Sequence, residues 1–386
     1  MLLVLHPVFA LTAVADAIIG PLLPSLAKAF HFSDSQSGLL FFSIFAGMAT
    51  GALLCRGNYG RIMMIGLLAL TASCFCFPWI PRSIIYPFAF FFGVSVGAPM
   101  TAVSLFAGRN YPAHRASVLT MLNFTWSAGA MLAPLIAARL LAVSSWSSVF
   151  VALGWASALA SIFVVITIRD SSETIRKTQE TTGLRNLRIV ALFALFFFLE
   201  VGLETMFGAW ITTYVLRVIR TSLTLAAATT AVYWTGFLVS RGLSSLLLLR
   251  MNSARLLQVA LPLALVASIL LVWSRSPVVL IVAILLLGST LAPIFPVALA
   301  NFFDRARHSS DSRFVLALSG FGASVFPWLV GSISSHSGSI GTGLIAGPVT
   351  LLIMTAMLPF VTARSATSSS ALDATADGSF VKSAND

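Results

Sequence analysis

Three acidic side chains stand inside long apolar stretches of the sequence: Asp16, Glu200 and Glu204. A charge at the centre of a lipid bilayer costs at least about 2.5 to 3.5 kcal/mol on insertion scales. Each acid therefore needs protonation, a basic partner such as Arg241, water or a polar solute. Glu200 and Glu204 are four residues apart, so they would share one helix face. Because two carboxylates one turn apart resist ionising together, the pair is a candidate proton-binding site.

Each of these acids also has a purely structural interpretation. Glu200 or Glu204 could simply face a water-filled crevice or vestibule. Asp16 is followed by Gly20, Pro21 and Pro24, residues that distort helices, so we expect an irregular helix beside it. Asp16 could cap that irregularity or pair with a basic neighbour. We keep Asp16, Glu200 and Glu204 as candidates for proton coupling or gating.

An amide and aromatic side chains accompany the acids. Asn123 lies in the run NFTWS, in which Trp126 and Ser127 follow three and four residues later on the same helix face. Sugars present hydroxyl edges and apolar C–H faces, which amides or carboxylates and aromatic rings recognise together. Asn123 and Trp126 are therefore candidate substrate-binding residues.

The second half of the chain offers a similar mixture. Trp210 follows Glu204 by six residues, so both could reach one substrate only if their helix were bent near Gly208. Trp234 and Arg241 are seven residues apart and nearly in line along one helix face. We take Glu204, Trp210 and Trp234 as candidate substrate contacts. Arg241 is a candidate for coupling or gating, or it could snorkel toward the cytoplasm.

Two prolines, Pro293 and Pro296, interrupt a further apolar stretch beside Phe295. Helix-breaking prolines free backbone carbonyls, and such backbone is tolerated at membrane depth only inside protein or around a cavity. Phe295 and Asn301 are therefore secondary candidates for substrate contact.

These residues require elements that carry them through a membrane. Of 386 residues, 58% are hydrophobic and 9% charged, more apolar surface than a soluble domain could bury. Long unbroken runs predict an all-α membrane protein rather than a barrel. Twelve spans are predicted, at about 2–28, 37–55, 62–80, 83–107, 115–140, 148–168, 188–216, 222–249, 256–274, 277–302, 313–335 and 339–362.

The net charge of +11 could indicate nucleic-acid binding, but its distribution does not. With twelve spans, sixteen of the Lys and Arg residues fall on the side of the N-terminus and five on the other. Cytoplasmic loops carry this excess, so we expect both termini in the cytoplasm and the protein in the cell inner membrane.

The chain also divides into two similar halves. A polar segment, 169–187, is expected to be a cytoplasmic linker between a six-helix bundle at 1–168 and another at 188–362, and the polar tail 363–386 is expected to be disordered. Three short patterns recur 193 to 195 residues apart: Arg56/Arg61 and Arg250/Arg255, GAMLAP at 129–134 and GASVFP at 322–327, and GVSVGAP at 93–99 and GSTLAP at 288–293. A duplicated bundle that binds solute between its halves is the expectation.

Four runs resemble one transporter family: ETMFGAWITTY from Glu204, YWTGFLVSR from Tyr233, APIFP at 292–296 and GFGASVFPWLVG at 320–331. They are similar to the major facilitator superfamily, in particular its branch of fucose permeases and related glucose transporters. The resemblance implies two pseudo-symmetric six-helix bundles, and it associates Asp16 with proton coupling. In CRGNYGR from Cys55, cysteine replaces the acid of the family signature, and span four lacks the glutamate of fucose permeases.

The resulting hypothesis is a transporter of a hexose such as glucose, galactose or fucose, working by alternating access, coupled to protons or sodium or uncoupled. We expect a monomer in the lipid bilayer that needs no cofactor or metal. A proton-driven exporter of small amphipathic compounds is the alternative, which the pattern from Gly129 to Pro134 favours. A sensor that binds without transporting stays open. An enzyme is disfavoured because the five histidines are scattered near span ends.

Overall fold

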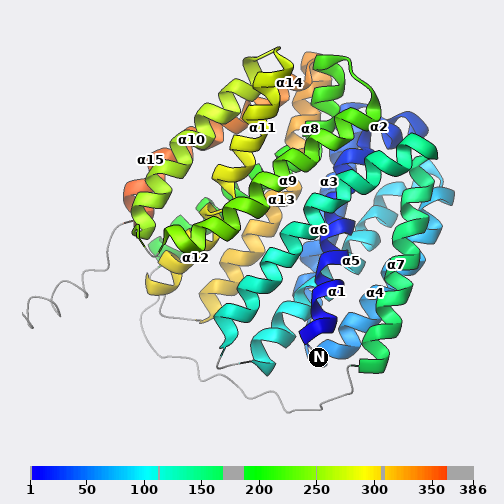
Figure 1. Cartoon of the computed structure of the whole chain (residues 1–386), viewed down its shortest axis with the longest axis horizontal. Helices are drawn as coiled ribbons and strands as arrows, with labels where there is room; N and C mark the ends of the chain where they lie inside the picture. Colours follow the sequence, from blue (N-terminus) through cyan, green and yellow to red (C-terminus); the bar gives the residue numbers. More distant parts are fainter. Residues whose placement is uncertain (1, 112–113, 168–186, 249, 306–308, 363–386) are drawn as a thin grey trace, which may run out of the picture.

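The computed structural model describes residues 2–111, 114–167, 187–248, 250–305 and 309–362. The predicted linker, 169–187, lies outside them except for its last residue, and the predicted tail lies outside them entirely. The described residues form helices throughout, joined by short loops (Figure 1).

The first half contains seven α-helices and two short 3-10 helices. Their bounds are α1 Leu2–Ala17, α2 Ile19–Phe30, α3 Asp34–Leu54, α4 Tyr59–Cys76, η1 Phe77–Trp79, η2 Arg82–Ile84, α5 Ile85–Asn110, α6 Arg115–Val143 and α7 Trp146–Thr167. The second half contains α8 Leu187–Ile219, α9 Leu223–Leu247, α10 Ser253–Trp273, α11 Pro277–Leu291, α12 Ile294–Arg305, α13 Ser309–Ser337, α14 Ile340–Leu344 and α15 Ala346–Thr362.

The helices match the predicted spans to within a few residues. Among the described residues, ten helical segments are long and apolar enough to cross a membrane, and the bent pair α1 and α2 makes an eleventh. The 29-residue helix α13 coincides with the remaining predicted span, 313–335. Large apolar side chains such as Phe91, Trp155 and Leu352 are more than 60% exposed on the outside of the bundle, as expected where lipid is the solvent. The prediction of an all-α, twelve-span membrane fold is thus confirmed.

Proline explains both interruptions that the sequence predicted. The first span bends by 42° at Ile18, between α1 and α2. In a regular helix the ring of Pro21 would clash with the carbonyl of Ala17, four residues earlier, and Pro21 has no N–H to donate to that carbonyl. The tenth span breaks between Leu291 and Ile294, where Pro293 and Pro296 act in the same way.

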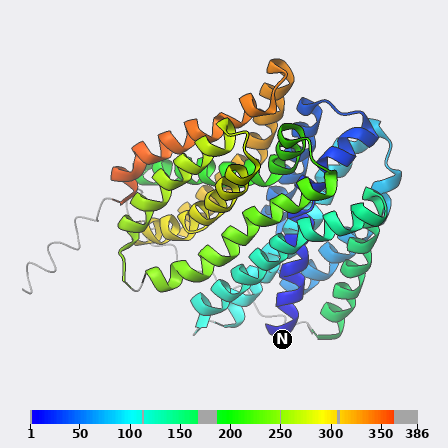
Figure 2. The ribbon, with the colours of Figure 1, turned by 45° about the horizontal axis from the view of Figure 1, so that its top comes forward.

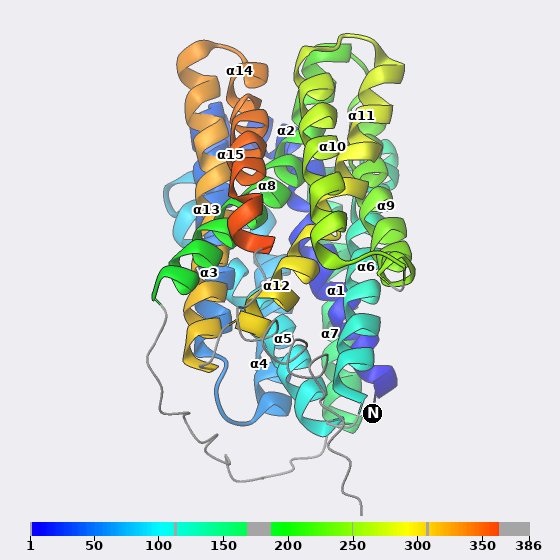
Figure 3. The ribbon, with the colours of Figure 1, turned by 90° about the vertical axis from the view of Figure 1, so that its left-hand side faces the viewer.

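The two halves of the chain meet along two helix pairs. Helix α3 packs against α13, and α6 packs against α9 (Figure 3). Glycines bring some of these backbones into direct contact: a Cβ added at Gly38 would lie 2.9 Å from the Cα of Trp328. We call the side with the α2–α3, α8–α9 and α10–α11 loops the outer side, because the charge distribution predicts that it faces away from the cytoplasm. The opposite side is called the inner side.

A third contact between the halves joins α2 to α8. A Cβ added at Gly20 would overlap the carbonyl oxygen of Gly208 and lie 3.3 Å from the Cα of Ala209. Only glycine permits this approach, since a helix backbone cannot move aside as a flexible side chain can.

The Gly20 contact predicts an asymmetry between two glycine substitutions. We expect Gly20→Ala to lower the free energy of unfolding by about 1 to 3 kcal/mol through overpacking. Gly242→Ala is the control, because a Cβ there would meet its nearest atom, Cε2 of Phe124, at 3.9 Å. The measurement is the midpoint of thermal unfolding in detergent. Equal midpoints for the two variants would contradict the close approach of α2 and α8.

Candidate functional site

Asp16 and Glu204 lie to the inner side of the Gly20–Gly208 contact. Asp16 precedes Gly20 by four residues, across the bend at Ile18, and Glu204 precedes Gly208 by four residues within α8, on the same face of that helix. Their carboxylates are close enough to repel each other. Both side chains are half-buried, whereas Glu200, one turn further along α8, is fully buried. The structure thus brings together an acid from each half.

Glu200 is a buried carboxylate without a hydrogen-bond partner in the described part of the chain. Its side chain is 0% exposed, and neither of its carboxylate oxygens has a hydrogen-bond partner among the described residues. The guanidinium of Arg241 attracts the carboxylates of both Glu200 and Glu204. Arg241 itself donates a 2.9 Å hydrogen bond to the hydroxyl of Ser127 on α6, across the two halves.

Two tryptophans from opposite halves form the aromatic part of the site. The rings of Trp126 on α6 and Trp234 on α9 meet edge to face, with centroids 5.6 Å apart and planes at 79°. The guanidinium of Arg241 lies 5.6 Å from the centroid of Trp126 and 5.2 Å from that of Phe237. Both indole N–H groups are buried, and neither has a hydrogen-bond partner among the described residues. A buried donor without an acceptor costs about 1 to 3 kcal/mol, so such donors are rare unless something else binds them.

Tyr233 and Phe237 were not recognised as site residues from the sequence. The hydroxyl of Tyr233 donates a 3.2 Å hydrogen bond to the backbone carbonyl of Glu204, and its ring contacts both Trp234 and Phe237. A signal was present, because Tyr233, Phe237 and Arg241 are spaced four residues apart and share a face of α9.

Gly208 makes room for a neighbouring helix. Helix α8 continues through it without a break, from Leu187 to Ile219. A Cβ added at Gly208 would lie 3.1 Å from Cζ2 of Trp234 on α9. The absence of a side chain at Gly208 therefore lets the indole of Trp234 pack against the backbone of α8.

Trp210 faces a different part of the molecule from Trp234. Its indole N–H donates a 2.9 Å hydrogen bond to the backbone carbonyl of Pro327 on α13, and its ring lies 6.3 Å from that of Phe41 on α3. The side chain is fully buried, and its single donor is already used. Trp210 therefore joins α8 to α13 and offers no polar atom to a solute here.

Two further predicted substrate contacts, Asn123 and Phe295, lie on different helices. The side chain of Asn123 is exposed. On α6 it lies on the opposite side from Leu132, which is 45% exposed on the outside of the bundle. Asn123 therefore shares the interior face of α6 with Trp126 and Ser127. Phe295 is half-buried at the start of α12, with its ring 5.0 Å from that of Phe197 on α8.

Asn301 and Gly129 each make a contact within the protein that holds helices together. The side-chain oxygen of Asn301 accepts a 3.0 Å hydrogen bond from the hydroxyl of Ser253. A Cβ added at Gly129 would overlap the carbonyl oxygen of Ala10, so this glycine permits the contact of α6 with α1. The described residues contain no group of three or more His, Cys, Asp or Glu side chains that could hold a metal ion.

Taken together, the central region presents hydrogen-bond donors, carboxylate acceptors and aromatic faces from both halves. The donors are the indoles of Trp126 and Trp234, and the acceptors are Asp16, Glu200 and Glu204. Such a set suits a neutral solute whose groups donate and accept hydrogen bonds and whose faces are apolar.

Comparisons with known proteins identify the family of the chain. A family model described as "Major Facilitator Superfamily" matches residues 5–313. The chain is 23% identical over 319 residues to "Sodium-dependent glucose transporter 1" of Xenopus laevis, and the match covers 73% of this chain and 65% of the frog protein. It is 20% identical over 333 residues to "Glucose/mannose transporter GlcP" of Bacillus subtilis, covering 81% of this chain and 82% of that protein.

A solved structure shows the same fold. The structure titled "Crystal structure of D-xylose-proton symporter" superposes with a TM-score of 0.76 at 13% identity, covering 94% of this chain and 98% of the other. At this identity the likeness concerns the fold alone.

Trp234 has an indole N–H without a partner among the described residues and Trp210 has one that is hydrogen-bonded, so we expect their substitutions to affect stability differently. We expect Trp234→Phe to leave the thermal unfolding midpoint of the solute-free protein unchanged or raised, because it keeps a ring and removes an unpartnered donor. Trp210→Phe is the matched control and should lower the free energy of unfolding by about 1 to 3 kcal/mol, because the carbonyl of Pro327 loses its donor. A loss of stability in Trp234→Phe as large as that in Trp210→Phe would contradict this difference between the two indoles.

Proposed function

This chain belongs to the major facilitator superfamily, and on that premise we propose that it carries a monosaccharide of the hexose class across the membrane by alternating access. The family match and the glucose-transporter relatives confirm the resemblance that the motifs indicated. It is a multi-pass membrane transporter rather than an enzyme. Its cargo, direction and coupling belong to the proposal.

The unpartnered indole N–H groups of Trp126 and Trp234 carry the proposal for the cargo. One comes from each half, and both lie beside aromatic faces, while Arg241, which lies over the ring of Trp126, also attracts the carboxylate of Glu200. A sugar hydroxyl can accept from an indole and donate to a carboxylate, while a C–H face of the sugar ring rests on an aromatic plate. Two relatives are named as glucose transporters, which supports a hexose over other small polar solutes.

Asp16 and Glu204 support coupling to a proton. They approach each other from opposite halves, so a proton shared between them would relieve their repulsion. Separation of the halves on one side of the membrane would change that repulsion and hence the affinity for the proton. Glu200 and Arg241 are further candidates, because their charges would alter the affinity of Asp16 and Glu204 for the proton.

The orientation is part of the same proposal. The excess of Lys and Arg on the inner side supports cytoplasmic termini in a cell inner membrane. The chain would then act as a monomer of two bundles, 1–168 and 188–362, joined by a cytoplasmic linker at 169–187 and followed by a tail at 363–386.

Uptake into proteoliposomes tests the cargo. We expect labelled hexose to enter vesicles that contain the protein and unlabelled hexose to compete with it. If no monosaccharide competed, the sugar proposal would fail. Export of an amphipathic dye in the same vesicles would then favour the alternative function.

Two variants test the coupling. We expect Asp16→Asn and Glu204→Gln to lose accumulation driven by a pH gradient while keeping exchange of hexose across the membrane. Asp373→Asn, in the predicted tail, is the control for an unrelated loss of negative charge. Loss of exchange as well as accumulation would instead identify the altered acid as a contact to the cargo, and unchanged accumulation would exclude it from coupling.

A further inference from the structure

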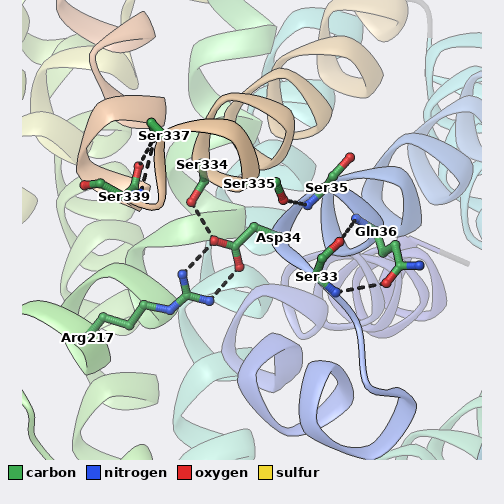
Figure 4. A network of polar contacts seen from close by, with 9 residues as sticks. All are labelled: Ser33, Asp34, Ser35, Gln36, Arg217, Ser334, Ser335, Ser337 and Ser339. Carbon is green, nitrogen blue, oxygen red and sulfur yellow. Dashed lines mark hydrogen bonds and ion pairs between the residues drawn. The ribbon is translucent and has the colours of Figure 1, made fainter.

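An ion pair joins the two halves at the outer side, well away from the central site. The guanidinium of Arg217, near the end of α8, donates 2.6 Å hydrogen bonds from Nη1 and Nη2 to Oδ2 and Oδ1 of Asp34, at the start of α3 (Figure 4). This two-pronged arrangement is the strongest geometry available to an arginine and a carboxylate. The side chains are 47% and 15% exposed, so water still reaches the pair.

Helix α13 adds two further bonds to the same turn of α3. The hydroxyl of Ser334 donates a 2.5 Å hydrogen bond to Oδ2 of Asp34, and the backbone N–H of Ser35 donates a 2.7 Å hydrogen bond to the hydroxyl of Ser335 (Figure 4). An N–H in the first turn of a helix has no partner within that helix, so Ser335 supplies one that would otherwise be water. The first turn of α3 is therefore bound to two helices of the opposite half.

Bonds within the first half also fix the start of α3. The side chain of Gln36 accepts a 3.0 Å hydrogen bond from the N–H of Ser33, while the hydroxyl of Ser33 accepts a 3.3 Å bond from the N–H of Gln36. This reciprocal cap defines where the helix begins, and it holds Asp34 in the first turn, where the helix dipole favours a negative charge.

Backbone contacts close the space next to these polar bonds. A Cβ added at Gly331 on α13 would overlap the carbonyl oxygen of Asp34, and Gly38 lies against Trp328 one turn further in. From this outer end the two halves diverge toward the inner side, so that the inner ends of α12 and α15 stand apart from those of α4 and α7 (Figures 1 and 2).

We propose that Asp34, Arg217, Ser334 and Ser335 form an outer latch, which holds the outer ends of the halves together and must break each time the central site opens outward. The latch rests on the alternating-access part of the proposed function but not on the identity of the cargo. Its strength sets the balance between outward-closed and outward-open molecules. Because the bonds are partly exposed, they can break and re-form without burying an unpaired charge.

Distance measurement between spin labels tests the latch without any cargo. Labels are attached at Ile84→Cys and Trp273→Cys, which are exposed at the outer ends of the two halves. The three native cysteines, which are unpaired, are first replaced by serine: Cys55, Cys74 and Cys76. We expect Asp34→Asn to increase the population with long distances about twofold to fivefold relative to the unaltered latch.

Arg82→Gln is the matched control. Arg82 also lies at the outer side and donates a 3.1 Å hydrogen bond to Gln36, but both residues belong to the first half. Its loss should leave the distances unchanged. If Asp34→Asn and Arg82→Gln shifted the distances equally, or if neither shifted them, the latch would be excluded.

Two further variants separate opening from misfolding. Ser334→Ala removes one of the bonds to Asp34 and should give a smaller shift in the same direction, with an unchanged thermal midpoint. The double variant Asp34→Arg with Arg217→Glu reverses the pair and should restore part of the short-distance population. A shift in distance with no monosaccharide transport would keep the latch and overturn only the cargo. Hexose transport with no shift in the distances would support the cargo and overturn the latch.

Discussion

A polar group held at membrane depth must find another polar group, and this constraint decides which side chains here are structural. Trp210 donates to the carbonyl of Pro327, and Tyr214 donates to that of Leu271 at 2.7 Å, so both are satisfied inside the protein. Trp126, Trp234 and Glu200 have no such partner among the described residues, and Arg241 lies over the ring of Trp126 and attracts the carboxylate of Glu200. These three side chains are therefore ones that a solute could pair.

The spans and their interruptions could be predicted because they follow from local chemistry. A run of apolar residues must form a helix in lipid, and a proline removes a backbone donor wherever it occurs. The bend at Ile18 and the break at Pro293 therefore appear where the sequence placed them. The acids Asp16 and Glu204 could also be singled out, since a charge in an apolar run is conspicuous on its own.

The remaining features depend on which helix lies opposite, and one sequence does not contain that information. Trp210 and Trp234 look alike in their motifs, yet one meets a free carbonyl on α13 and the other does not. Gly208 is equally consistent with a bend and with a neighbouring indole, and only the position of α9 decides between them. Asp34 and Arg217 are 183 residues apart, and nothing local marks them as partners.

The glycine contacts between the halves have a consequence for how the halves can move. Where Gly20 meets Gly208 and Gly331 meets Asp34, two bare backbones touch without interlocking side chains. Two helices that touch in this way can change their crossing angle with little repacking, whereas interlocked side chains would first have to separate. At the Gly331 contact, the resistance to a tilt of one half on the other therefore comes from the polar bonds of Asp34 beside it, which can be changed one residue at a time.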